Sequence, residues 1–137
     1  MARILAIDYG GKRTGLAVTD PLQIIATGLA TIESRDLITY LKNYFLSEQV
    51  ELVIIGLPKN LDDSDTHGTP LVEKTIKQLK KKFPSMPLRT VDERYTSKMA
   101  KDAMLEMGMK KKDRRVKGNV DIIAATIMLQ EYLQNKH

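Results

Sequence analysis

Runs of apolar residues predict four strands in the first half of the chain. The run 3–8 is continuous and closes on a carboxylate, which is typical of a strand covered on both faces, so we expect it at the centre of a sheet. Turn signals at Gly10-Gly11 and Asp20-Pro21 separate it from two further β-rich stretches, which favours an antiparallel meander. The four predicted strands cover residues 3–8, 14–20, 24–32 and 52–57.

Apolar residues at helical spacing predict four helices, the first before the fourth of these strands and the others after it. Ser34 fits the N-cap of the first helix, and Thr69-Pro70 fit the N-cap and N1 positions of the second. Gly108 ends the third helix, and the last begins near Asn119. The helices cover about 37–45, 69–83, 99–107 and 119 onward, with one more short strand at 88–92 between the second and the third.

The order of these elements, βββαβαβαα, predicts an α/β fold. Its mixed sheet would combine an antiparallel three-strand meander with parallel strands made by right-handed crossovers, and helices would flank both faces. A length of 137 residues suits one domain, which we place at 1–137 because no repeat or linker interrupts it.

Composition narrows the class of protein. The absence of cysteine excludes disulfides and thiolate metal sites and fits a reducing cytoplasm. The apolar run after Met1 is too short for a signal peptide or a membrane span, so we expect a soluble, cytoplasmic protein with no membrane partner. A net charge of +5 favours a polyanionic partner such as nucleic acid, although an ordinary basic surface explains it equally well.

Two acidic residues stand at the carboxyl ends of predicted strands, where open α/β sheets build their sites. Asp8 ends the central strand beside a glycine pair that allows close approach of a ligand, although an aspartate before glycine often only caps a turn. Glu93 follows the strand 88–92. Its neighbour Asp92 points to the opposite side in an extended segment, and periodicity alone does not decide which of the two faces Asp8.

Asp121 opens a helix that is apolar nearly all round and therefore predicted to be buried. A buried, unpaired carboxylate costs several kcal/mol, so such a residue is normally protonated, paired or bound to a cation. Ala124 and Ala125, one turn later, are small enough to let the helix approach a strand. The alternative is that Asp121 only complements the helix dipole.

Three oxygen ligands in a chain without cysteine suit Mg²⁺ or Mn²⁺, whose shells are completed by water and substrate phosphate. This set indicates phosphoryl chemistry that needs no histidine base. His67 and the neighbouring acids instead fit a solvated loop, because they lack the spacing of a calcium-binding loop. Those acids are Asp62, Asp63 and Asp65.

Four segments in order resemble a known family. They are residues 8–17 (DYGGKRTGLA), 55–58 (IGLP), 92–97 (DERYTS) and 121–125 (DIIAA), the last with Leu129-Gln130. Together they resemble the YqgF family, also called RuvX, of Holliday junction resolvases, which is reassigned in part to trimming the 5′ end of pre-16S ribosomal RNA. The resemblance spans almost the whole chain, but the loop 59–68 departs from the glycine-rich form usual in the family.

The resemblance implies a ribonuclease-H-like fold, a bacterial cytoplasmic setting and a metal-dependent nuclease. It also implies that Asp8, Glu93 and Asp121 are both the catalytic and the metal-binding residues, with Mg²⁺ or Mn²⁺ as cofactor.

Basic residues near these acids are candidates for phosphate contacts, arginine in bidentate fashion and lysine as a point charge. A stretch between 110 and 117 would act as a phosphate clamp, or would simply be a solvated loop. Few aromatic residues lie nearby, so recognition by shape or backbone is expected. The nucleic-acid-binding candidates are Lys12, Arg13, Arg94, Lys110, Lys111, Lys112, Arg114, Arg115 and Lys117.

The expected partner is structured RNA or branched DNA, bound by a monomer or a homodimer. Two other functions stay open at this stage. One is a non-catalytic module that binds nucleic acid or the ribosome. The other is an ATP-binding protein of the actin and sugar-kinase type. That class closes two lobes over its nucleotide, and 137 residues are enough for only one of them.

Overall fold

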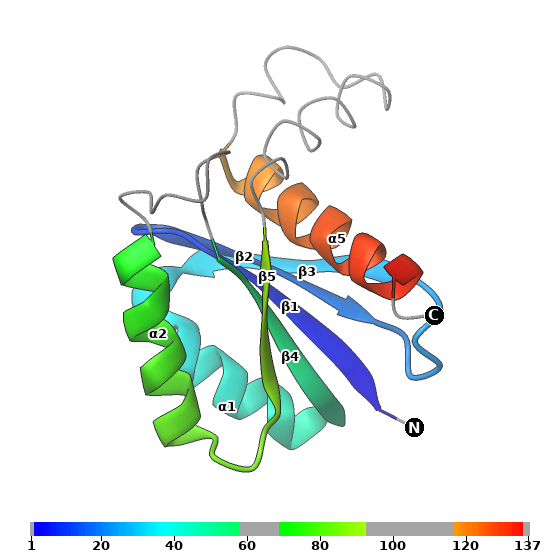
Figure 1. Cartoon of the computed structure of the whole chain (residues 1–137), viewed down its shortest axis with the longest axis horizontal. Coiled ribbons are helices and arrows are strands. Elements are labelled where there is room, and N and C mark those ends of the chain that lie inside the picture. Colours follow the sequence, from blue (N-terminus) through cyan, green and yellow to red (C-terminus); the bar gives the residue numbers. More distant parts are fainter. Residues whose placement is uncertain (1, 58–68, 93–116, 136–137) are drawn as a thin grey trace.

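A five-stranded mixed sheet forms the centre of the protein (Figure 1). The structure is a computed structural model, and it describes residues 2–57, 69–92 and 117–135. The strands are β1 (Arg3–Tyr9), β2 (Arg13–Thr19), β3 (Ala26–Glu33), β4 (Val50–Leu57) and β5 (Leu88–Asp92). The helices are η1 (Ser34–Asp36), α1 (Leu37–Ser47), α2 (Thr69–Lys82) and α5 (Lys117–Asn135).

The strand order β3-β2-β1-β4-β5 confirms the predicted topology. β1 pairs antiparallel with β2, and β2 pairs antiparallel with β3, which makes the meander. β1 and β4 are parallel, as are β4 and β5, because a helical crossover joins each pair. The predicted central place of β1 is confirmed, and its first four core residues are at most 1% exposed.

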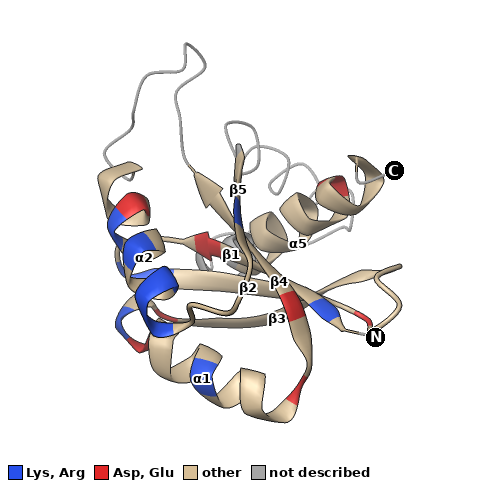
Figure 2. Ribbon diagram, turned by 60° about the horizontal axis from the view of Figure 1, so that its bottom comes forward, with Lys and Arg blue, Asp and Glu red and all other residues tan. Residues whose placement is uncertain are grey.

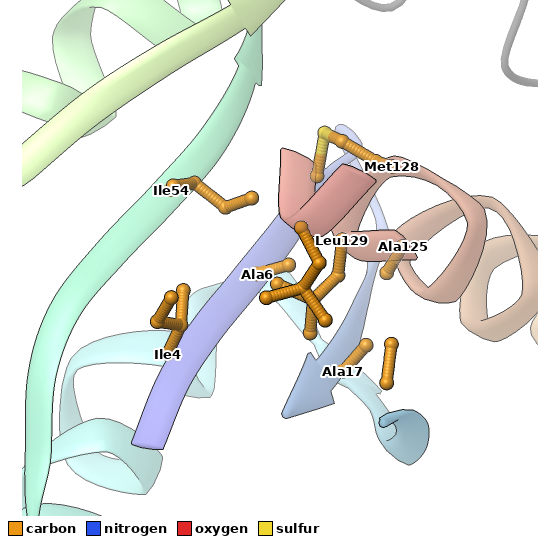
Figure 3. Packing of buried hydrophobic residues seen from close by; sticks show 9 residues of the cluster. Ile4, Ala6, Ala17, Ile54, Ala125, Met128 and Leu129 are labelled. Atoms are coloured by element: carbon orange, nitrogen blue, oxygen red, sulfur yellow. The ribbon is translucent and has the colours of Figure 1, made fainter. Parts of the chain in front are cut away.

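Alternate residues of β1 serve two separate cores. Ile4 and Ala6 pack beneath α5, as Figure 3 shows. Leu5 and Ile7 belong to the core on the opposite face, under α1 and α2. Even-numbered positions of β1 therefore face α5.

Small residues line the contact between α5 and the sheet. Ala6, Ala17 and Ala125 are all fully buried in one cluster, so the helix lies close to the strands, as predicted from its alanine pair. The buried face of α5 covers fewer positions than its nearly uniform apolar composition predicts. Positions 124, 125, 128, 129 and 133 are buried, whereas Ile122 and Ile123 are only half-buried.

One predicted helix cap is wrong, and one predicted loop is shorter than expected. Ser34 does not cap α1, whose N-cap is Asp36, because the Ser34 hydroxyl is engaged elsewhere. α5 begins at Lys117, two residues before the predicted start near Asn119, so Lys117 and Gly118 belong to the helix and not to the predicted basic loop. The first turn of a helix lacks intrahelical N–H bonds, which makes a glycine there inexpensive. The predicted helix 99–107 and the loop 59–68 lie outside the described residues.

Gly28 on β3 should be required for the seating of α5. A Cβ atom there would lie 2.5 Å from Cγ2 of Ile122, a branched methyl that cannot swing away easily. We expect Gly28→Ala to lower the free energy of unfolding by about 1–3 kcal/mol. In the double variant that also carries Ile122→Ala, the total loss of unfolding free energy should be about 1 kcal/mol smaller than the sum of the two single-variant losses. Denaturant titrations measure all three losses. Strictly additive losses would contradict this packing.

Asp20 closes the β2–β3 turn and should contribute to the stability of the fold in a way that is lost in acid. Its carboxylate accepts hydrogen bonds from the backbone N–H groups of Ile24 and Ile25, both at 2.8 Å, and of Leu22 at 3.2 Å. These bonds, above all that from Ile25, lower the pKa of Asp20 below its ordinary 3.8. The stabilisation is therefore present above the unfolded pKa and is lost as pH falls through the lower folded pKa.

We expect Asp20→Asn to be less stable than the natural chain at neutral pH and to approach it in strong acid. Denaturant unfolding from about pH 2 to pH 6 would measure the difference. A difference that does not depend on pH would show that the carboxylate charge plays no part.

Candidate active site at the carboxyl end of β1

Asp8 lies near the end of β1, on the face that α5 covers. It has the same parity as Ile4 and Ala6, and it pairs across the sheet with Gly15 of β2. Gly15 is buried and contributes no side chain beside the carboxylate. Asp8 is partly exposed, whereas Ile7 before it is fully buried. A rigid, buried strand thus presents a carboxylate at an accessible edge.

α5 runs so that its first turns point toward this edge. Its last turns, at Leu133 and Gln134, line a groove with the β2–β3 turn, which lies at the opposite end of β1 from Asp8. Asp121 is one turn before Ala125, which packs against the sheet. The helix backbone therefore brings position 121 to the Asp8 end of the sheet.

The structure describes the sequence-predicted site in part. Asp8, Lys12 and Arg13 lie together at one end of the β1–β2 hairpin, and β5 ends at Asp92 beside Leu57 of β4. Lys117 is the first residue of α5. Glu93, Arg94 and the remaining cations lie outside the described residues. Those cations are Lys110, Lys111, Lys112, Arg114 and Arg115.

The tight turn that follows β1 depends on Gly10. A Cβ atom at Gly10 would meet the carbonyl oxygen of Arg13 at 2.5 Å, which the backbone cannot relieve locally. At Gly11 the nearest atom would be Cδ1 of Leu71 at 3.9 Å, an ordinary contact that places this turn against the first turn of α2. The two glycines are thus not equivalent, although the sequence shows them as a pair.

Buried hydroxyl groups fasten this turn to η1. Ser34 Oγ donates to the carbonyl of Gly10, and Thr14 Oγ1 lies 2.8 Å from Ser34 Oγ, so that Thr14 is left as the donor. The backbone N–H of Ser34 also donates to the carbonyl of Lys12 at 2.9 Å. Both hydroxyls are buried, at 0% and 6% exposure, so this network holds the turn that carries Lys12 and Arg13.

Sequence reasoning missed two charged residues near Lys12 and Arg13. Arg35 and Glu33 line one surface depression together with Gly11, Lys12 and Arg13. Arg35 Nε donates to Glu33 Oε2 at 2.7 Å, with both side chains exposed. The available signal was the hairpin register, which pairs Arg13 with Glu33 once β3 is aligned on β2. Figure 2 shows the charged residues of the described part of the chain.

Two further properties hold for the described part of the chain. It contains no group of three or more histidine, aspartate or glutamate side chains placed to hold a metal ion. Within the same residues, no helix has the length and apolar character needed to cross a membrane.

Sequence comparisons identify relatives over nearly the full chain. A family profile described as "RuvX: Holliday junction resolvase" matches residues 2–135. A relative from Flavobacterium psychrophilum, named "Putative pre-16S rRNA nuclease", is 53% identical over 136 residues, with 99% of both chains covered. A relative of the same name from Bacteroides fragilis is 51% identical over 136 residues, again covering 99% of each.

Solved structures show the same fold at much lower identity. Thermus thermophilus RuvC in complex with Holliday junction substrate matches with a TM-score of 0.56 at 13% identity, covering 98% of this chain and 96% of that one. A second Thermus thermophilus RuvC structure gives a TM-score of 0.54 at 12% identity, with the same coverage. The chain therefore belongs to the RuvX family, and it has the ribonuclease-H-like fold that it shares with RuvC.

Proposed function

We propose that this chain is a metal-dependent nuclease that hydrolyses phosphodiester bonds in structured nucleic acid, with Asp8, Glu93 and Asp121 as its catalytic acids. The observation that supports the proposal is periodicity: the described neighbours of each acid that share its strand parity or helical phase all lie between the sheet and α5. The names of the relatives support nuclease chemistry.

The parity of β5 favours Glu93 over Asp92. Val91 packs with the cluster beneath α5, and Arg89 donates to the hydroxyl of Tyr132 on α5, so odd positions of β5 face that helix. Residue 93 has the same parity and residue 92 the opposite one. β5 and β1 both run parallel to β4, so their carboxyl ends meet at one edge of the sheet.

Helical spacing supports Asp121 as the third member. It stands four residues before Ala125 and seven before Met128, and both of these are buried against the sheet. Positions at these intervals share one face of a helix. A dipole-complementing role alone would not require an acid at this helical phase.

The donor set fits Mg²⁺ or Mn²⁺, because carboxylate oxygens are their preferred protein ligands. Bound there, such ions would supply an activated water and stabilise charge on the leaving oxygen. Asp8, fixed by a strand that is buried on both faces, would hold its ligand position without reorganisation. Lys12 and Arg13 would orient the phosphates of the substrate, because the turn that carries them is tied to η1.

We favour pre-16S ribosomal RNA as the substrate, since both relatives reported above are named for it, and trimming of its 5′ end is what the family resemblance implies. Cleavage of a four-way DNA junction is the second candidate, favoured by the family description. It requires two symmetric cuts and hence two copies of the chain. A trimming nuclease could act as a monomer.

Cleavage assays on a labelled pre-16S leader RNA and a labelled four-way DNA junction test this function. We expect cutting with Mg²⁺ or Mn²⁺ and none with EDTA. Asp8→Asn, Glu93→Gln and Asp121→Asn should each lower the rate by more than about a hundredfold, because losing a metal ligand removes several kcal/mol of transition-state stabilisation.

Glu73→Gln is a matched control, since Glu73 is an exposed acid on α2 and its loss changes the net charge by the same amount. It should cut at the natural rate. Binding of both substrates without cutting under every metal condition would contradict the nuclease and favour a non-catalytic binding module. ATP-induced thermal stabilisation would instead favour the nucleotide-binding alternative.

The glycine pair offers a second, structural test of the site. Gly10→Ala should reduce cleavage by about tenfold or more, because its Cβ would displace the turn that begins two residues after Asp8. Gly11→Ala should retain cleavage within about twofold, since its Cβ makes only an ordinary contact. The measurement is kcat/KM on the better substrate, with thermal unfolding to check that each variant is folded. Equal losses in both variants would argue against this turn geometry.

A further inference from the structure

We propose that the depression lined by Lys12, Arg13 and Arg35 binds a backbone phosphate next to the scissile one, and that Glu33 competes with this phosphate for Arg35. The inference rests on the proposed function, because it assigns a subsite for the same nucleic-acid substrate. It adds Arg35 and Glu33, which no sequence motif marked, to the binding surface. We call this depression the flanking-phosphate site.

Two chain segments build the flanking-phosphate site. The β1–β2 turn supplies Gly11, Lys12 and Arg13, and the junction of β3 with η1 supplies Glu33 and Arg35. The register Arg13↔Glu33 sets the segments side by side, and the buried bonds of Ser34 to Gly10 and Lys12 join them at the next residue. The cations are therefore gathered by fixed backbone, rather than by chance contact of flexible side chains.

The charge of the flanking-phosphate site fits one phosphate. Among the residues that the structure describes, Lys12, Arg13, Arg35 and the Glu33 carboxylate line it, so these side chains together carry a net positive charge. Arginine has five N–H donors, and the bond to Glu33 engages the one on Nε. Phosphate accepts such donors bidentately, which is geometry that a lysine cluster lacks.

The Arg35–Glu33 pair is easy to exchange. The side chains are 81% and 58% exposed, and exposed ion pairs contribute at most about 1 kcal/mol. A phosphate that also meets Lys12 and Arg13 can therefore displace the Glu33 carboxylate from Arg35. Glu33 then favours binding of a phosphate that contacts several of these cations at once, because an anion that contacts Arg35 alone would not displace the Glu33 carboxylate from it.

The position of the site selects nucleic acid as its occupant. Lys12 and Arg13 follow Asp8 within five residues, and Asp8 pairs with Gly15 just beyond Arg13. A polymer whose phosphate is cut at Asp8 carries neighbouring phosphates at regular short spacing on both sides. An acidic protein segment shares the charge but has no reason to lie beside the acids.

Binding measurements test the site separately from cleavage. The labelled leader RNA and the labelled DNA junction are titrated by fluorescence anisotropy in EDTA, from about 50 to 200 mM salt. Gel electrophoresis confirms that the substrates stay intact. Arg35→Gln should weaken binding about tenfold, and the slope of log K against log salt should fall by about 0.7 to 0.9.

Glu33→Gln should have the opposite effect and tighten binding about two- to fivefold, because it releases Arg35 and removes a repelling charge. In the Arg35→Gln background, the gain in affinity from Glu33→Gln should be smaller, because only the removal of the repelling Glu33 charge remains and no arginine is released. A full gain in that background would overturn the competition between Glu33 and the phosphate.

Two control variants change charge by the same amount elsewhere. Glu48→Gln removes the acid of the Arg3–Glu48 pair, whose Nε–Oε2 distance is 3.3 Å at the far end of β1, and Lys42→Gln removes an exposed cation of α1. Both should change affinity by less than about twofold.

Equal effects at Arg35 and Lys42 would overturn the flanking-phosphate site and leave the nuclease untouched. Loss of cleavage in Asp8→Asn together with unchanged binding in Arg35→Gln would separate the two proposals in the same way. Tighter binding of an acidic peptide than of either nucleic acid would overturn the assignment of the occupant.

Discussion

The burial of β1 on both faces is the constraint on which the rest of the structure depends. Ile4, Leu5, Ala6 and Ile7 are each at most 1% exposed, and they alternate between the core beneath α5 and the core beneath α1 and α2. A shift of one residue would exchange every side chain between two cores of different size, so the register is strongly specified. That register decides which face carries Asp8. The backbone that carries the carboxylate is thus positioned by apolar packing several residues away.

The closeness of α5 to the sheet follows from the small residues between them. Ala6, Ala17 and Ala125 are buried together, and Gly28 lies under Ile122. Larger side chains at these points would raise the helix and move its first turns away from the end of β1. Asp8 and position 121 are therefore coupled through packing. This explains why alanine and glycine, which bury little apolar surface themselves, occupy the interface beneath an otherwise bulky helix.

Much of the fold was predictable because β1 and β4 are apolar runs long enough to exclude a surface strand, and because turn signals separate the first three strands. The position of Asp8 near the end of the central strand was predictable for the same reason, since it closes the apolar run that forms β1. Ser34 was assigned wrongly: a serine before a helical pattern has the local signature of an N-cap, but Thr14 and Gly10 lie nearby only after β2 and β3 have paired. Arg35 escaped notice because its neighbours Lys12 and Arg13 are remote in sequence. Local patterns thus reveal elements, whereas contacts across the hairpin need the folded sheet.

The two ends of the proposed site differ in how tightly they are packed, and this difference suits them to different roles. Asp8 extends from a strand whose side chains cannot rearrange, which suits a ligand that must keep its geometry through a reaction. Arg35 is 81% exposed on a three-residue helix and must lose rotamer freedom whenever it binds an anion. Under the proposed function, such a residue would contribute equally to binding of the substrate and of the transition state, so its loss would raise KM, whereas loss of Asp8 would lower kcat. The buried Ser34 network lies between them, and it ties the turn that carries Lys12 and Arg13 to η1, which carries Arg35.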